Sequence, residues 1–268
     1  MKTRLITSAI GIPFLVFVLV VRGWFAELLL VLLTLIALRE CYNALRTADY
    51  EVCCWGGYLG AIVMWPLSRL MGVLDPLLLV AAAMGVSMLG VLMGKKPTFP
   101  NAAASVWPLF TCLMPLSMFM MMLNATYGVV PGIALITMSF GIAFGCDAAA
   151  YLGGRTLGKH KLCPAVSPKK TVEGAVCGVF GSVLVAQLVR LFFVHVLGTP
   201  MPGVPAALLL GVIGSVAGQI GDLTASLLKR HSGIKDYGTL FPGHGGVMDR
   251  FDSVIIVMIV LYCYTLVL

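Results

Sequence analysis

The sequence contains few charged residues. Only 11% of its 268 residues are Asp, Glu, Lys or Arg, whereas 60% are hydrophobic. An average soluble domain carries about 25% charged residues. A soluble fold of this length could not remove so many apolar side chains from water. The composition therefore excludes an ordinary soluble protein and predicts a protein whose solvent is lipid.

The sequence also lacks the cysteine spacing that is typical of zinc sites and redox motifs. Its eight cysteines are scattered, and no CxxC pair occurs. We interpret them as packing residues and predict neither a disulfide nor a cysteine-bound metal. The net charge of +7 would suggest a nucleic-acid partner in a soluble protein. Here the basic residues lie between apolar runs, so we predict no nucleic-acid binding and attribute the charge to membrane topology and phosphate binding.

Apolar runs follow one another along the chain. A membrane-spanning helix needs about 20 mostly apolar residues, and about nine stretches approach that length. They are 5–21, 24–38, 53–72, 76–94, 102–123, 129–152, 174–198, 204–228 and 253–268. We therefore predict an all-α, polytopic membrane bundle of about nine transmembrane helices. Residues 1–125 would be generic membrane helices, and residues 126–268 a catalytic membrane domain.

Basic residues are unevenly shared between the two sides of this predicted bundle. The segments between spans, assigned alternately from the N-terminus, place fifteen basic residues on one side and only Arg22 and Arg69 on the other. The fifteen are Lys2, Arg4, Arg39, Arg46, Lys95, Lys96, Arg155, Lys159, Lys161, Lys169, Lys170, Lys229, Arg230, Lys235 and Arg250. Positive loops remain in the cytoplasm. We expect a cytoplasmic N-terminus, a retained first span, and two long cytoplasmic loops at 153–173 and 229–252, most simply in a bacterial inner membrane.

Two aspartates lie within predicted spans, where ionisable groups are costly and usually functional. Asp222 lies seven residues before Lys229, about 10 Å along a helix. Its helical face also carries Ser215, Gln219 and Ser226 at spacings of three and four. Asp147 forms a shorter stripe with Tyr151 and Arg155. Both stripes could instead be hydrogen bonds that join helices, and Asp147 could simply pair with a basic residue.

The segment after the eighth span combines acids, cations and glycines. Asp249 and Asp252 are three residues apart and would face the same way on a helix. Such carboxylates suit Mg²⁺, which binds through one or two carboxylates plus substrate phosphates. The preceding His244, Gly245 and Gly246 would let a backbone approach a phosphate. The surrounding cations are Lys229, Arg230, Lys235 and Arg250. This combination is typical of nucleotidyl or phosphoryl transfer.

The other long loop contains the sequence SPKKT at 167–171. Ser167, Lys169, Lys170 and Thr171 can all donate to phosphate. The alternative is that the lysines only retain the loop in the cytoplasm. The histidines at 160, 195 and 231 receive no role.

The segment SLLKRHSGIKDYGTLFPGHGGVMDRFD, residues 226–252, resembles the complete signature of the phosphatidate cytidylyltransferase family. SPKKTVEG at 167–174 and GQIGDL at 218–223 are similar to that family as well. The resemblance covers roughly residues 147–268, while the first 125 residues match only as membrane helices.

This resemblance implies that CTP and phosphatidate give CDP-diacylglycerol and pyrophosphate with Mg²⁺ at the membrane, in phospholipid synthesis, and that a homodimer forms. Its implied catalytic residues are Asp222, Asp249, Lys229, Arg250 and His244. Its implied substrate-binding residues are Ser167, Lys169, Lys170, Thr171, Ser226, Arg230, Lys235, Gly245 and Gly246. Its implied metal ligands are Asp222 and Asp249, with Asp252 and Asp147 as further candidates.

Two other functions fit parts of the pattern. A CTP-dependent lipid or polyprenol kinase would need the same nucleotide and metal but would transfer the terminal phosphoryl group. A cation-coupled transporter would use the aspartates within spans, although no inverted repeat is visible and the polar residues gather at one face.

Overall fold

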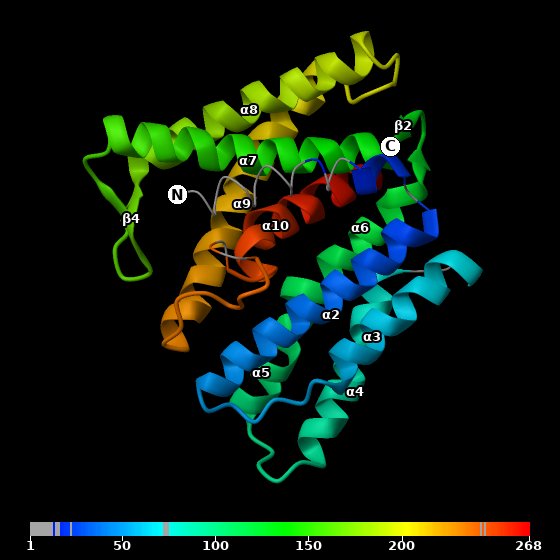
Figure 1. Ribbon diagram of the computed structural model, residues 1–268, viewed down its shortest axis with the longest axis vertical. Coiled ribbons are helices and arrows are strands. Elements are labelled where there is room, and N and C mark those ends of the chain that lie inside the picture. The colour runs from blue at the N-terminus through cyan, green and yellow to red at the C-terminus, as the bar shows by residue number, and fades with distance from the viewer. Residues whose placement is uncertain (1–12, 14–16, 22, 72–74, 242, 244) are drawn as a thin grey trace. The chain divides into compact units, whose positions relative to one another are not determined.

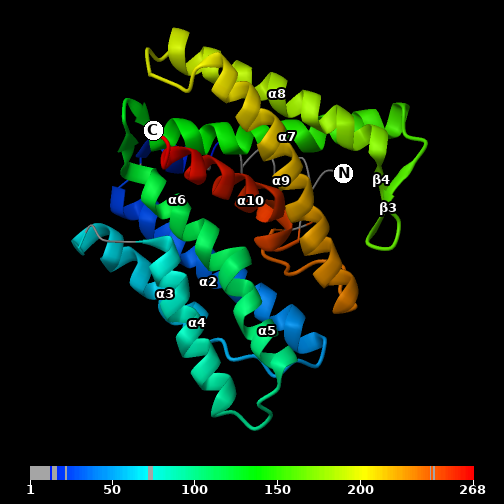
Figure 2. The ribbon, with the colours of Figure 1, turned by 180° about the vertical axis from the view of Figure 1, so that it is seen from behind.

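The computed structural model describes residues 13, 17–21, 23–71, 75–241, 243 and 245–268. Helices make up most of this part of the chain, with two short β-hairpins (Figures 1 and 2). The chain divides into two units, each held by its own contacts. The first unit comprises Met1–Leu123 and Leu228–Phe251, and the second comprises Asn124–Leu227 and Asp252–Leu268.

The first unit contains the helices of the N-terminal half. They are α2 (Gly23–Thr47), α3 (Trp55–Pro66), the π-helical turn η1 (Leu67–Met71), α4 (Pro76–Leu92), α5 (Phe99–Pro108), the π-helical turn η2 (Leu109–Leu113) and most of α6 (Met114–Asn124). Each π-helical turn directly follows a proline at the end of an α-helix. Proline lacks an N–H group and crowds the preceding turn, so the wider hydrogen-bonding pattern accommodates it without ending the span.

Large side chains fill the interior of the first unit. Tyr42 of α2 is fully buried, and its hydroxyl donates to the carbonyl of Ser105 at 3.4 Å. Gly57 of α3 faces this ring, and a Cβ there would lie 2.6 Å from the Tyr42 hydroxyl oxygen. Leu38 is also buried at this contact, 3.3 Å from the same Cβ position. A small residue in α3 therefore allows α2 and α3 to approach closely.

The second unit is built around a helical hairpin. Its elements are β1 (Thr126–Tyr127), β2 (Val130–Pro131), α7 (Gly132–Thr156), β3 (Lys161–Cys163), β4 (Ser167–Thr171), α8 (Val172–His195) and most of α9 (Val204–His231) and α10 (Met248–Thr265). Helices α7 and α8 run side by side, and the β3–β4 hairpin joins them at one end (Figures 1 and 2). The short strands β1 and β2 pair where α6 leads into α7.

Glycines bring α7 and α8 into backbone contact. A Cβ at Gly181 would collide with the side chain of Ala149 and lie 2.7 Å from the carbonyl oxygen of Gly145. A Cβ at Gly145 would lie 2.8 Å from Val185. Small residues at such spacing are typical of helix pairs in membranes, where close packing replaces the hydrophobic effect. Ser182 adds a hydrogen bond to the carbonyl of Ile142 at 2.9 Å.

The helices have the length and surface of membrane-spanning segments. Within the part of the chain that the structure describes, five are long and apolar enough to cross a bilayer: α2, the continuous stretch Phe99–Asn124, α7, α8 and α9. Their outer faces expose large apolar side chains, for example Phe180, Leu184 and Leu188 on α8. Such a surface belongs in lipid, so the predicted helical, multi-pass class is confirmed at this level. The count of nine spans stays a prediction, and most of the first predicted span, 5–21, lies outside the described residues.

The element boundaries differ from the predicted ones in three places. Helix α2 continues to Thr47, nine residues beyond the predicted end of its span. The predicted loop at 153–173 contains the last turn of α7 and the β3–β4 hairpin, and the predicted loop at 229–252 is shortened to 232–247 by α9 and α10. Each time, polar residues that interrupt an apolar run extend the helix or strand, because their side chains find partners in the protein.

Candidate active site

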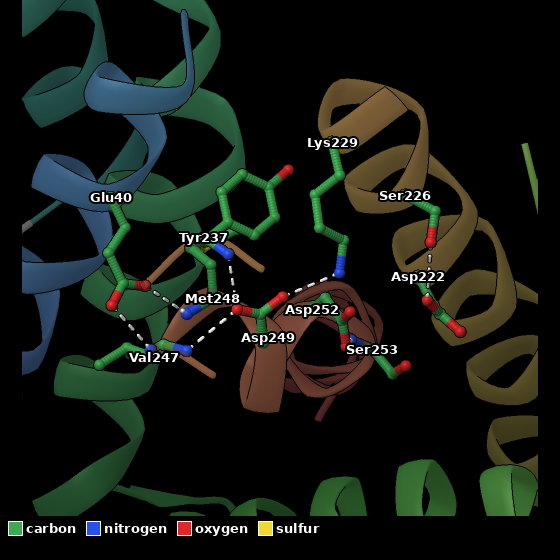
Figure 3. A network of polar contacts seen from close by, with 11 residues as sticks. Glu40, Asp222, Ser226, Lys229, Tyr237, Val247, Met248, Asp249, Asp252 and Ser253 are labelled. Carbon is green, nitrogen blue, oxygen red and sulfur yellow. Dashed lines mark hydrogen bonds and ion pairs between the residues drawn. The ribbon is translucent and has the colours of Figure 1, made fainter. Parts of the chain in front are cut away.

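Asp249 is the centre of a hydrogen-bonded network in the first unit (Figure 3). It lies in the first turn of α10, and only 3% of its side chain is exposed. Its Oδ1 accepts from Nζ of Lys229 at 2.8 Å. Its Oδ2 accepts from the backbone N–H groups of Tyr237 at 2.7 Å and Gly246 at 2.9 Å. One carboxylate therefore gathers the end of α9, the connecting segment 232–247 and the start of α10.

Lys229 contacts both this carboxylate and an aromatic ring. Its side chain is 14% exposed and lies over the Tyr237 ring, with Nζ 5.3 Å from the ring centroid. A cation over an aromatic face is attracted to the ring's negative surface. The buried Asp249–Lys229 pair thus combines charge attraction, hydrogen bonding and a cation–π contact. Such additional interactions offset the cost of removing two charges from water.

The glycines of the connecting segment make room for carboxylates of the chain itself. Gly245 has φ +86°, a left-handed conformation that side chains rarely adopt. A Cβ at Gly245 would lie 2.6 Å from Oδ2 of Asp249, and a Cβ at Gly246 would collide with the carboxylate of Glu40. The sequence interpretation assigned these glycines to phosphate binding, and that role stays a prediction. In the structure, they let two acids approach the backbone.

Glu40 of α2 is a site residue that the sequence interpretation missed. Its Oε1 accepts from the N–H of Val247 at 3.1 Å and its Oε2 from the N–H of Met248 at 2.9 Å, both at the start of α10 (Figure 3). The signal was an acid directly after a predicted span, since a carboxylate beside an apolar run needs a partner if it becomes buried. The predicted span ends at 38, so the sequence pattern places Glu40 outside it.

A second pair of predicted residues meets within the second unit. Lys170 of β4 forms an ion pair with Oδ2 of Asp222 at 2.5 Å, and both side chains are about one quarter exposed. Ser226 donates to Oδ1 of the same aspartate at 3.3 Å (Figure 3). The predicted polar stripe along α9 continues one turn earlier, where Gln219 donates to Ser215 at 3.2 Å. The β3–β4 hairpin therefore brings the SPKKT segment onto the acidic face of α9.

The other residues of the SPKKT segment have different positions. Thr171 is buried and is the N-cap of α8, where its hydroxyl accepts from the N–H of Gly174 at 3.1 Å. This capping bond satisfies one of the donors that a helix start leaves open. Lys169 is exposed and Ser167 is half-buried in β4. Lysines at neighbouring positions of a strand point to opposite sides, which explains why only one of them is paired with Asp222.

The remaining predicted residues are distributed over several elements. Asp147 is exposed on α7, and Oδ1 of Asp252 accepts from the N–H of Ser253 at 2.8 Å in the first turns of α10. Arg230, Lys235 and Arg250 are exposed. His244 lies outside the described residues.

The acids of both units have the chemistry that a magnesium ion requires. Carboxylate oxygens are the hard ligands that Mg²⁺ prefers, and Mg²⁺ usually binds one or two of them together with substrate phosphates. Within either unit, the described residues form no group of three or more His, Cys, Asp or Glu side chains that could hold a metal ion. Asp222 and Asp249 are each bound to one lysine. Each of these carboxylates, taken by itself, has the oxygen donors that Mg²⁺ can bind together with substrate phosphates.

Comparison with known proteins extends the similarity over the full chain. A family model described as the cytidylyltransferase family matches residues 2–268. The phosphatidate cytidylyltransferase of Staphylococcus haemolyticus is 35% identical over 265 residues, which cover 96% of each chain. Proteins of the same name from Staphylococcus epidermidis and Staphylococcus aureus are 33% and 34% identical, again over 96% of each chain. The similarity therefore includes the N-terminal helices, which the sequence interpretation had treated as generic.

Proposed function

We infer that this chain, which belongs to the cytidylyltransferase family, transfers a cytidylyl group from CTP to phosphatidate and so forms CDP-diacylglycerol and pyrophosphate. The structural observation that supports this proposal most directly is a buried ion pair in the signature segment. The signature segment is folded around a buried carboxylate–ammonium pair, Asp249 and Lys229, at the start of an apolar helix. Such a pair suits chemistry on phosphate groups of a substrate whose acyl chains stay in lipid.

In the proposed reaction, an anionic phosphate oxygen of phosphatidate attacks the α-phosphorus of CTP. A bond forms between that oxygen and the α-phosphorus, and the bond from the α-phosphorus to the bridging oxygen breaks. Pyrophosphate leaves with the electron pair. The nucleophile is already an anion, so no general base is needed. The main obstacle is repulsion between two polyanions, which nearby cations reduce.

The chain provides these cations at fixed places. Lys229 and Lys170 are held by Asp249 and Asp222, so their ammonium groups are already oriented before substrate arrives. Arg230, Lys235, Arg250 and Lys169 are exposed and can attract CTP from water. Preorganised charges stabilise a charged transition state more than mobile ones, because they need not reorient during the reaction.

Mg²⁺ is part of the proposal, with Asp222 and Asp249 as its leading ligands and Asp252 and Asp147 as further candidates. Bound there, the ion would neutralise charge on the triphosphate and on departing pyrophosphate. The aspartates would hold it through carboxylate oxygens, and the lysines would limit how much negative charge accumulates around it.

The place of the reaction follows from the charge of the loops. We propose a bacterial inner membrane protein with the active site on the cytoplasmic side, where CTP is available. The β3–β4 hairpin and its flanks carry five basic residues: Arg155, Lys159, Lys161, Lys169 and Lys170. Loops of this kind remain in the cytoplasm. The homodimer implied by the resemblance stays a prediction.

Transfer of label from CTP tests the reaction. Purified protein in detergent, phosphatidate and Mg²⁺ are incubated with CTP labelled at the α-phosphorus. Cytidylyl transfer puts the label into the lipid and releases unlabelled pyrophosphate. A lipid kinase would leave the label on CDP, and a transporter would consume no CTP. Either result would overturn the proposal.

A further inference from the structure

The residue directly before α10 has an apolar side chain that cannot accept a hydrogen bond. Val247 occupies the position where a Ser, Thr, Asp or Asn commonly accepts from the first N–H groups of a helix. Asp249 accepts from the N–H of Gly246, one residue before that position. Unsatisfied N–H groups at a buried helix start are unfavourable, so this helix needs an acceptor from elsewhere in the chain.

Glu40, which lies 207 positions before Val247 in the sequence, supplies that acceptor. It is 7% exposed, and its two oxygens each take one N–H, from Val247 and from Met248. The negative charge also interacts favourably with the positive end of the α10 dipole. Figure 3 shows Glu40 and Asp249 on either side of the backbone at Val247.

The two carboxylates fix the same short stretch of backbone from different directions. Glu40 holds the N–H groups of residues 247 and 248, while Asp249 holds the N–H of Gly246. Gly238 and Gly246 lack side chains where Glu40 approaches, and a Cβ at either would collide with its carboxylate. Any displacement of Glu40 would therefore release the peptide that positions Asp249.

We propose that Glu40 is a positioning residue of the active site, which fixes the turn before α10 and thereby the orientation of the Asp249 carboxylate. The proposal rests on the proposed function, because the activity affected is cytidylyl transfer. It assigns a part in the site to a helix of the N-terminal half. Glu40 acts through Asp249 and the backbone and does not itself contact substrate.

Substitutions of Glu40 and of a matched acid on the same helix test the proposal. Glu27 of α2 is 2% exposed and accepts from Trp65 at 3.0 Å and Arg69 at 3.3 Å, about 20 Å along the helix from Glu40. Glu40→Gln keeps one acceptor oxygen but turns an NH₂ group toward the second N–H. We expect kcat to fall about tenfold in Glu40→Gln and up to about a hundredfold in Glu40→Ala. Glu27→Gln should retain the kcat of the unaltered protein.

Hydrogen–deuterium exchange supplies a readout that does not depend on activity. Amides of the peptide 245–251 should exchange faster in Glu40→Gln than in the unaltered protein and in Glu27→Gln, whereas peptides from α7 and α8 should not change. Unchanged exchange at 245–251, or full kcat in Glu40→Gln, would overturn the proposal. If the unaltered protein transfers no cytidylyl group, the proposed function fails, and exchange alone decides whether Glu40 holds the turn.

A double variant separates positioning from a general structural role. Asp249→Glu keeps the charge but moves its oxygens. If Glu40 acts through Asp249, the losses in kcat from Glu40→Gln and Asp249→Glu should not multiply when combined. Losses that multiply would mean that Glu40 affects the enzyme independently of Asp249, which contradicts the proposed role.

Discussion

The carboxylate of Asp249 is bound by three donors, one from a side chain and two from the backbone. Such restraint is more than a stabilising ion pair needs. It fixes both oxygens of the acid in one orientation, which is the condition for precise binding of a metal ion.

Asp249→Asn should fold and insert into the membrane but lose at least about a hundredfold in kcat. The amide keeps the shape of the side chain and one acceptor oxygen, while the charge needed for the polar site is lost. Purified variant protein would be compared with the unaltered chain by gel filtration and by transfer of labelled CTP. Asp75→Asn is the control, because Asp75 caps α4 and asparagine is an equally good cap. Full activity of Asp249→Asn would remove this residue from the proposed metal site.

Lys169 and Lys170 are neighbours in sequence but should differ in function. Lys170 is paired with Asp222, whereas Lys169 is exposed. We expect Lys170→Met to lower kcat by about tenfold or more, because it removes an oriented charge beside Asp222, a proposed metal ligand. Lys169→Met should mainly raise the KM for CTP, since an exposed cation contributes general attraction that salt screens. Steady-state kinetics at two salt concentrations measure both effects, and equal losses of kcat would contradict the assignment.

The close packing of α7 against α8 depends on glycines. Gly181 leaves no room for a Cβ, because Ala149 and the backbone of Gly145 lie against it. Gly181→Ala should therefore force the helices apart and destabilise the protein by about 1–3 kcal/mol. Gly85 of α4 has nothing within 4 Å of its would-be Cβ. Gly85→Ala should be neutral or slightly stabilising, as in any helix interior.

Thermal unfolding in detergent measures both glycine variants. A lower Tm for Gly181→Ala with an unchanged or higher Tm for Gly85→Ala is the expected pattern. A Tm for Gly181→Ala equal to that of the unaltered chain would mean that the two helices can separate without loss. It would then be wrong to treat their close approach as a source of stability.

Periodicity and composition predicted the centres of the helices but not their ends. Apolar runs identified the spans that became α7, α8 and α9, because burial in lipid dictates residue type along the whole span. The β3–β4 hairpin was predicted as a loop. Its strands, KLC at 161–163 and SPKKT at 167–171, are too short and too rich in Lys to show a strand pattern, and their pairing from Lys161 to Thr171 depends on geometry. The ion pair between Lys170 and Asp222 could not be predicted either, because it depends on how this hairpin folds.

Contacts between residues that lie far apart in the sequence could not be predicted from local patterns. The signature segment was predicted together with the C-terminal half, on the basis of its own residues. In the structure, Leu228–Phe251 belongs to the same unit as the N-terminal helices, and Glu40 is bonded within it. No local pattern links position 40 with positions 247 and 248. Glycine spacing and charge predict where the chemistry lies in the chain, but they do not indicate that α2 contacts this segment.

The orientation of the chain in the membrane can be tested on α8, whose ends differ in charge. The helix has 24 residues and is about 36 Å long, enough to cross a hydrocarbon core of about 30 Å. The hairpin before it carries Lys161, Lys169 and Lys170, whereas residues 196–203 after it contain no Lys or Arg. Since positive segments remain in the cytoplasm, Cys163 of the hairpin should lie inside the cell and Thr199 outside.

Labelling with a membrane-impermeant maleimide distinguishes the two ends. One variant keeps Cys163 as its only cysteine, and a second combines Thr199→Cys with replacement of all eight native cysteines. In intact spheroplasts, we expect label on Thr199→Cys and none on Cys163, with both labelled after permeabilisation. Label on Cys163 in intact cells would place the basic hairpin outside, away from cytosolic CTP. The proposed reaction would then lack its nucleotide on the side where Lys170 and Asp222 meet, because CTP does not cross the bilayer unaided.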